Sequence, residues 1–206
     1  MSREIIPEFY IIFVVIHHVV QNLTLLSMET NVSVWKANLV NGLILGLLGV
    51  VYTLVMYFFD LTFKQWQAWV WVLLQIIILF FLVKSYRDTY RHGMITFGQA
   101  FGAGMVICLY YAIIAAIFTY ILYAVIDTNL VDKQLAFTEN MMLERGLPEE
   151  AVEMSMRMQK KIMVPAVMAP ISILGSMFYG LVMSLIVAAF VRREGNPLVD
   201  TSVTEG

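Results

Sequence analysis

The sequence predicts an all-α membrane protein: a polytopic helix bundle with four transmembrane helices and an amphipathic helical hairpin between the third and the fourth. Of the 206 residues, 60% are hydrophobic and 14% are charged, against about 45–50% and about 25% in soluble domains. A water-soluble fold has no interior large enough to bury this excess, so the bilayer must be its solvent. The apolar residues also gather in long stretches between short charged segments.

The first two predicted spans run from Trp35 to Phe59 and from Trp66 to Val83. At ~1.5 Å per residue the first covers ~37 Å, enough to cross a hydrocarbon core of ~30 Å. Trp66, Trp69 and Trp71 are typical of an aromatic belt at one end of a span. Because the connection 60–65 is short, we expect these two helices to be antiparallel neighbours.

The third span lies within Met94–Asp127, after a basic segment, Lys84–Gly93, that we interpret as a loop. The fourth is Pro165–Val191, in which Pro170 should bend the helix or mark its true start. These limits leave a charged segment between the last two spans.

That charged segment, about 128–163, predicts two short helices, about 129–145 and 148–163, that meet at Gly146. Glycine commonly ends a helix, and Pro148 followed by two glutamates is typical of a helix start. On the first helix an apolar stripe that includes Phe137 and Met141 suits a helix lying on the membrane surface.

We divide the chain into an N-terminal extension of doubtful status (1–27), a membrane domain (28–193) and a disordered cytoplasmic tail (194–206). Residues 9–26 are apolar, but polar residues interrupt them, so they are a possible fifth transmembrane helix and a poor signal peptide. We favour Met28 as the natural start. The basic residues of 84–93 and Arg192–Arg193 then place both termini in the cytoplasm by the positive-inside rule.

Several segments together resemble a bacterial family of uncharacterised four-span proteins, the domain of unknown function numbered four-one-nine-nine. The resemblance covers about residues 28–193. It rests on residues 28–36 before a Gly-Leu-Ile-Leu-Gly-Leu-Leu-Gly span, on Lys84-Ser-Tyr-Arg-Asp with the segment Ile95-Thr-Phe-Gly-Gln-Ala-Phe-Gly-Ala-Gly, and on residues 118–127 with the hairpin around Gly146-Leu-Pro-Glu-Glu. It implies a location in the bacterial inner (plasma) membrane and a start near Met28. It implies no activity.

Small residues at four-residue spacing predict close helix packing, because removing Cβ lets another backbone approach. They are Gly42 and Gly46 on the first span and Gly98, Ala100, Gly102 and Gly104 on the third. We expect the third span to pack on the first within one chain. A seam between copies in a homo-oligomer is the alternative.

Two glutamines, Gln75 in mid-span and Gln99 near the start of the third span, are candidates for a polar site, with hydrogen bonds between helices as the ordinary explanation. Met154 and Met158 form a weak candidate for a soft metal such as Cu(I). Met156 points to the opposite side of the helix, so the segment alone cannot gather three sulfurs. We therefore expect no metal site and no cofactor.

The expected function is binding rather than catalysis. Between Gly42 and Phe190 no Asp, Glu, Lys or Arg lies inside a predicted span, and the chain carries no catalytic triad, zinc motif or phosphate-binding loop. A net charge of -2 argues against nucleic acid as a partner. We expect a non-catalytic accessory subunit of an envelope complex, surrounded by the lipid bilayer and contacting other membrane proteins or its own copies. Permeation of a small solute or ion by an oligomer is the first alternative, and soft-metal binding by the methionine-rich hairpin is the second.

Overall fold

A computed structural model of the chain describes residues 33–194, and the predictions for 1–27, the possible fifth helix and most of the tail lie outside this range. The described part is helical apart from its turns and one isolated bridge, as predicted. The helices are listed in chain order: α2 (Val34–Phe58), α3 (Gln65–Tyr90), α4 (Phe97–Ile121), the π-helix η1 (Leu122–Ile126), α5 (Leu130–Glu144), α6 (Glu149–Ile162) and α7 (Pro165–Val191).

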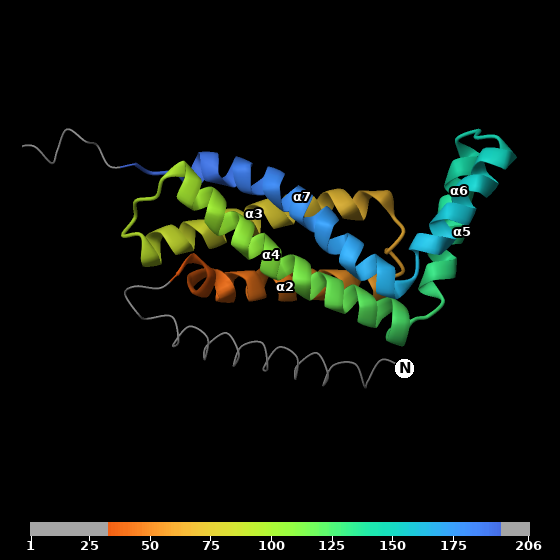
Figure 1. Cartoon of the computed structure of the whole chain (residues 1–206), viewed down its shortest axis with the longest axis horizontal. Coiled ribbons are helices and arrows are strands. Elements are labelled where there is room, and N and C mark those ends of the chain that lie inside the picture. Colours follow the sequence, from red (N-terminus) through yellow and green to blue (C-terminus); the bar gives the residue numbers. More distant parts are fainter. Residues whose placement is uncertain (1–32, 195–206) are drawn as a thin grey trace, which may run out of the picture.

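Four helices form a bundle, and α5 with α6 forms a hairpin that crosses one end of it at a steep angle (Figure 1). Within the described residues, α2, α3, α4 with η1, and α7 are long and apolar enough to cross a membrane. The prediction of an all-α, four-span bundle is confirmed, and the protein is a multi-pass membrane protein.

Helix α4 is the centre of the bundle. It packs against α7 and α2 along much of their lengths, whereas α3 makes less extensive contacts with its neighbours. Its start is tied to the end of α7 by a two-bond antiparallel bridge, in which the N–H of Ile95 donates to the carbonyl of Arg193 and the reverse bond has the same length of 2.9 Å. Ile95 is buried, so this bridge closes one end of the bundle.

Helix α3 is longer than the sequence predicted, because it continues to Tyr90 through the segment we interpreted as a loop. This segment contains no glycine or proline before Gly93, which has a φ of 79°. Tyr86 is buried in the core, and Arg87 Nη1 donates to the carbonyl of Val191 at 3.2 Å. These contacts hold the basic segment against the bundle as a helix.

The hairpin turns where the sequence predicted. Gly146 has a φ of 76°, the N–H of Gly146 donates to the carbonyl of Leu143, and the N–H of Leu147 donates to that of Met142. This is the Schellman pattern of a helix that ends at a glycine. A small apolar cluster of Leu135, Val152 and Met156 joins the two helices.

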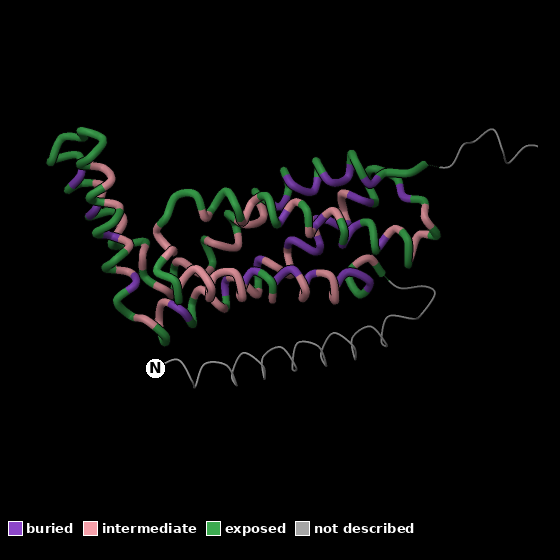
Figure 2. The backbone as a smooth tube through the Cα atoms, turned by 180° about the vertical axis from the view of Figure 1, so that it is seen from behind, coloured by how far each residue is buried: buried purple, intermediate pink, exposed green. Residues whose placement is uncertain are grey.

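Burial is uneven along the bundle, and Figure 2 shows the buried backbone concentrated away from the hairpin. The main core includes Leu45, Leu79, Ile107 and Val187. Helix α7 begins at Pro165 and continues through Pro170. The half of the bundle nearer the hairpin is less tightly filled, and the cavities described below lie there.

Candidate functional site

The glycines of α2 lie directly against α4. A Cβ added to Gly42 would overlap the Cβ of Tyr110, and one added to Gly46 would overlap the side chain of Ile114. Gly49, one turn further on, faces Tyr111 at 2.8 Å from where its Cβ would be. Van der Waals packing at this distance is the gain that small residues bring between membrane helices.

The small residues of α4 divide between two surroundings. Ala100 is buried, and a Cβ on Gly104 would lie 2.7 Å from the Ser184 hydroxyl of α7. A Cβ on Gly98 or Gly102 would have no other atom within 4 Å, leaving aside the backbone of its own helix. The structure therefore brings Ala100 and Gly104 into the bundle and leaves Gly98 and Gly102 facing outward.

The two glutamines lie at different levels of the bundle. Gln99 is exposed at the start of α4, where its side-chain oxygen accepts from the N–H of Thr96, and the Thr96 hydroxyl accepts from the N–H of Gln99. This reciprocal pair is a capping box, which supplies partners to backbone groups that the helix start leaves unpaired. Gln99 thus has a structural task, and the apolar core separates it from Gln75.

Gln75 borders a cavity of about 380 Å³ in the half of the bundle nearer the hairpin. The lining residues come from all four spans and the α2–α3 connection: Tyr52, Thr53, Met56, Thr62, Gln67, Ala68, Trp71, Val72, Gln75, Tyr111, Ser176, Tyr179 and Met183. A smaller cavity of about 180 Å³ shares Thr53, Tyr111 and Ser176 with it. The size of the larger one lies within the range of small-molecule sites.

Hydrogen bonds and ring contacts fix the aromatic wall of this cavity. The Tyr52 hydroxyl donates to the carbonyl of Gln67 at 2.6 Å, and Trp71 Nε1 donates to the Tyr111 hydroxyl at 3.0 Å. The Tyr52 and Trp71 rings stack with centroids 4.9 Å apart. The wall is therefore held in place before anything enters.

The methionines of the hairpin separate as the helix period predicts. Met154 and Met158 are 68% and 59% exposed, whereas Met156 is buried against α5. The sulfur of Met141 accepts hydrogen bonds from Gln65 and Arg145. Within residues 33–194 no group of three His, Cys, Asp or Glu side chains is placed to hold a metal ion.

Helix α6 carries a second apolar stripe besides the face that packs on α5. Its members follow helical spacing and are all exposed: Leu147 in the turn before the helix, then Ala151, Met154, Met158 and Ile162. The extensive contacts of α6 are with α5. This row, which we call the α6 stripe, therefore lies uncovered on the outer side of the hairpin.

Part of the α5 stripe that the sequence predicts for the membrane surface contacts the α2–α3 connection. The Phe137 ring stacks on Phe63 with centroids 5.7 Å apart, and Phe137 remains 38% exposed. Met141 meets Gln65 in the same region. Helix α5 thus rests on the end of the bundle and presents α6 outward.

Asp127 is the joint between the bundle and the hairpin. Its carboxylate accepts from Lys133 Nζ at 2.9 Å, from the N–H of Asn129 at 3.0 Å and from the Tyr57 hydroxyl at 3.3 Å. The hydrogen bond from Lys133 lowers the pKa of Asp127, with partial burial acting against it and Asn129 adding to it, and the same bond raises the pKa of Lys133. The pair is charged at neutral pH and fixes where α5 leaves η1.

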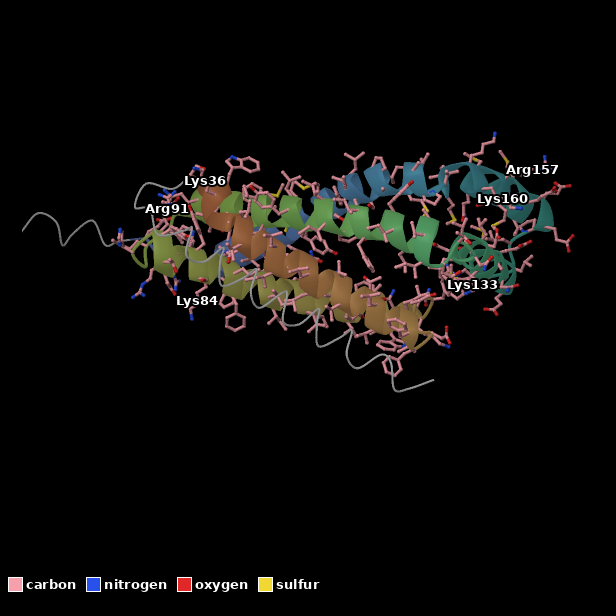
Figure 3. The ribbon with its side chains drawn as sticks, turned by 90° about the horizontal axis from the view of Figure 1, so that it is seen from below. Lys36, Lys84, Arg91, Lys133, Arg157 and Lys160 are labelled. Atoms are coloured by element: carbon pink, nitrogen blue, oxygen red, sulfur yellow. The ribbon has the colours of Figure 1, made fainter. Side chains whose placement is uncertain are left out.

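Charge divides the molecule into two ends, and Figure 3 shows Lys36, Lys84 and Arg91 at one end and Lys133, Arg157 and Lys160 at the other. The first end, which we call the basic end, also holds Arg87, Arg192 and Arg193, with only Asp88 and Glu194 as described acidic residues. The hairpin end carries more acidic than basic residues: Asp60, Asp127, Asp132, Glu139, Glu144, Glu149, Glu150 and Glu153, with Lys64, Lys133, Arg145, Arg157, Lys160 and Lys161.

A comparison with known families gives a match over most of the chain. Residues 41–193 match the family described as protein of unknown function (DUF4199). The chain belongs to this family. The match begins within α2 and ends two residues beyond α7, so it contains both the bundle and the hairpin of this DUF4199 protein. No curated protein and no solved structure matches the chain.

Sequence reasoning missed two features of the DUF4199 bundle. A Cβ on Gly180 would lie 2.7 Å from Cys108 Cβ, so Gly180 is a close-packing glycine of α7. The seam between α4 and α7 is built from Gly104 and Cys108 on one helix and Gly180 and Ser184 on the other, and the four-residue spacing of the second pair is visible in the sequence. The second missed feature is the cavity beside Gln75, which no residue spacing in the sequence indicates.

Proposed function

We propose that this DUF4199 protein is a non-catalytic accessory subunit of an envelope complex, and that it binds a partner protein through the α6 stripe. The observation that carries the proposal is the double-faced character of α6. One apolar face is used by α5, and the second, with Met154 and Met158, has no cover in residues 33–194. Methionine-rich surfaces are adaptable and are common at protein-binding sites.

Charge favours a protein partner over the membrane surface for this stripe. Helices that lie on membranes carry Lys and Arg on their polar face, which attract anionic lipids. The polar side of α6 mixes Glu149, Glu150 and Glu153 with Arg157, Lys160 and Lys161. Such a mixed face gains little from an anionic surface, and it suits the polar rim around an apolar contact between proteins.

We propose that the protein lies in the bacterial inner membrane with its basic end in the cytoplasm and the hairpin outside. The positive-inside rule counts Lys and Arg in short loops near the spans. All six basic residues at the basic end lie next to the apolar core of a span: Lys36 in the first turn of α2, three in the segment 84–91, and Arg192 and Arg193 directly after α7. The start of α2 and the end of α7 both lie at this end, so the segments that precede and follow them begin in the cytoplasm.

The absence of catalytic groups from the described bundle supports binding over chemistry. The two cavities within the spans are lined by neutral side chains, and within residues 33–194 no group of three His, Cys, Asp or Glu side chains is placed to hold a metal ion. The polar lining around Gln75 ends at the apolar core, which favours an accessory role over a continuous path for a solute.

Native mass spectrometry of the tagged protein, purified in mild detergent at its natural expression level, tests the accessory role. We expect a second, unrelated polypeptide in stoichiometric amount. The double substitution Met154→Ser and Met158→Ser should release it, whereas Lys160→Ser, on the polar side of the same helix, should retain it. All three side chains are exposed, so the variants should fold, with stability changes within about 0.5 kcal/mol each.

Two results would overturn the accessory role. One is a spectrum of the protein alone or only in copies of itself, which would favour permeation by an oligomer. The other is a partner that the double variant retains, because that partner would bind elsewhere on the molecule.

A further inference from the structure

The cavity beside Gln75 offers hydrogen-bonding groups that nothing in the described chain uses. Gln75 is only 5% exposed, and its amide has no hydrogen-bond partner within residues 33–194. Yet no fully enclosed side-chain polar atom in this range lacks a partner. The amide must therefore be reachable, and since Gln75 lines the cavity, the cavity is what reaches it.

A second free group lies on the facing helix. The Tyr111 oxygen accepts the bond from Trp71, and its own proton has no acceptor in the described residues. The cavity thus presents the O–H of Tyr111 as a donor, together with the two N–H groups and the oxygen of the Gln75 amide. In these apolar surroundings an occupant that pairs with the groups is favoured over one that cannot, because a polar group is poorly solvated there.

The remaining walls define what that occupant is. All the lining residues are neutral, so a charged molecule would lose its hydration with no opposite charge in return. The stacked rings of Tyr52 and Trp71 favour a flat, apolar ring, and Met56 and Met183 adapt to its shape. All the lining residues except Thr62 lie within the candidate spans. Because the cavity therefore lies at the level of the membrane, its occupant must dissolve in lipid.

We propose that this cavity binds a neutral, lipid-soluble ring compound that carries a carbonyl group, the chemical class of the quinones. The carbonyl accepts from Tyr111 and Gln75, and the ring lies against Trp71. This is a binding site and involves no reaction. It is independent of the partner surface on α6, which lies outside the bundle.

Tryptophan fluorescence provides the test, because Trp71 is the only one of the four tryptophans that lines the cavity. Trp35, Trp66 and Trp69 are replaced by Phe in the full chain, which is then placed in lipid nanodiscs and titrated with menadione, a naphthoquinone without a lipid tail. We expect quenching that saturates. Gln75→Leu should raise the half-saturating concentration about threefold to tenfold, as loss of a hydrogen bond predicts.

Gln65→Leu is the matched control, since it makes the same exchange on the same helix outside the cavity, and it should leave the titration unchanged. Ala68→Phe fills the cavity from α3 and keeps the test decisive where Gln75→Leu does not fold. It should abolish saturation. Quenching that rises in proportion to menadione in every variant would overturn the proposal and leave the cavity to water or lipid chains.

Discussion

Single glycines differ in what surrounds them, although the sequence presents them alike. Gly42 lies against the Cβ of Tyr110, which is close to the backbone and has little freedom to move. Gly102, at the same helical spacing on α4, has nothing within 4 Å of its potential Cβ outside its own helix. Four-residue spacing alone therefore does not decide which glycine is a packing residue.

Replacing these two glycines by alanine tests the assignment. Gly42→Ala should destabilise the bundle by about 1–3 kcal/mol, because Tyr110 must shift. Gly102→Ala should be neutral or stabilising by up to about 1 kcal/mol, because alanine is the better helix former. Thermal unfolding in detergent, followed by circular dichroism, measures both. A marked loss at Gly102→Ala would contradict the account and indicate that another helix or a second copy covers this face.

The capping box at the start of α4 gives a second residue-scale prediction. Gln99→Leu should lower stability by about 0.5–1.5 kcal/mol, because it removes the hydrogen bond that the N–H of Thr96 donates to the Gln99 side chain. Gln99→Glu preserves a capping-box residue and should keep most of that stability. The same unfolding measurement distinguishes them. If both variants unfold like the natural chain, Gln99 is not a cap.

Features that neighbouring residues determine could be predicted from the sequence, whereas features that depend on how the helices are arranged could not. Thr96-x-x-Gln99 is visible in the sequence as a capping box, and we interpreted Gln99 as a polar site because its neighbours are glycines. The number of spans and the turn at Gly146 were predictable because composition and glycine decide them locally. The end of α3 at Tyr90 was not, because contacts of Tyr86 and Arg87 with the bundle hold the basic segment as a helix. The sequence could not predict that Gly98 is exposed or that a cavity lies beside Gln75, because both depend on where the helices diverge.

At the scale of elements, the hairpin is fixed to the bundle by a small polar joint. Asp127 connects the end of α2, through Tyr57, to the first turn of α5, through Lys133. It follows directly on a π-helix, a rare element that often marks functional positions. The contact of Phe137 with Phe63 is a second, apolar attachment. Together these contacts set the direction in which α6 faces.

The joint should give a defined pH dependence. Folding lowers the pKa of Asp127, so its contribution is present above the ordinary value of 3.8 and is lost as the pH falls through the lowered value. Folding raises the pKa of Lys133, so that contribution is present below 10.5 and is lost as the pH rises through the raised value. We expect a plateau of stability between about pH 5 and about pH 9.

Asp127→Asn measures this contribution. The unfolding temperature of the natural chain should exceed that of the variant on the plateau, and the difference should vanish at acid pH. Asp132→Asn, on the same hairpin and outside the joint, is the control. A difference that persists unchanged below the folded pKa of Asp127 would contradict the ion-pair account.

For the molecule as a whole, the separation of charge predicts its orientation. The basic end and the hairpin end lie at opposite ends of four spans. The only cysteine of the chain, Cys108, is fully buried, so it gives little background in labelling experiments. New cysteines at the two ends can therefore report which one faces out.

Glu139→Cys in the hairpin should react with a membrane-impermeant maleimide in intact cells. Lys84→Cys at the basic end should react only after the membrane is opened, because the positive-inside rule places it in the cytoplasm. Labelling is read by the mass added to the purified protein. The reverse pattern would place the hairpin in the cytoplasm and contradict the proposed orientation.

The central claim is that the α6 stripe contacts a partner protein, and photocrosslinking in living cells tests it most directly. A photoreactive amino acid is placed at Met158, on the stripe, and separately at Lys160, on the polar side of the same helix. We predict that position 158 forms one discrete adduct with another protein and that position 160 does not. Adducts of lipid size only, or the same adduct from both positions, would contradict the claim.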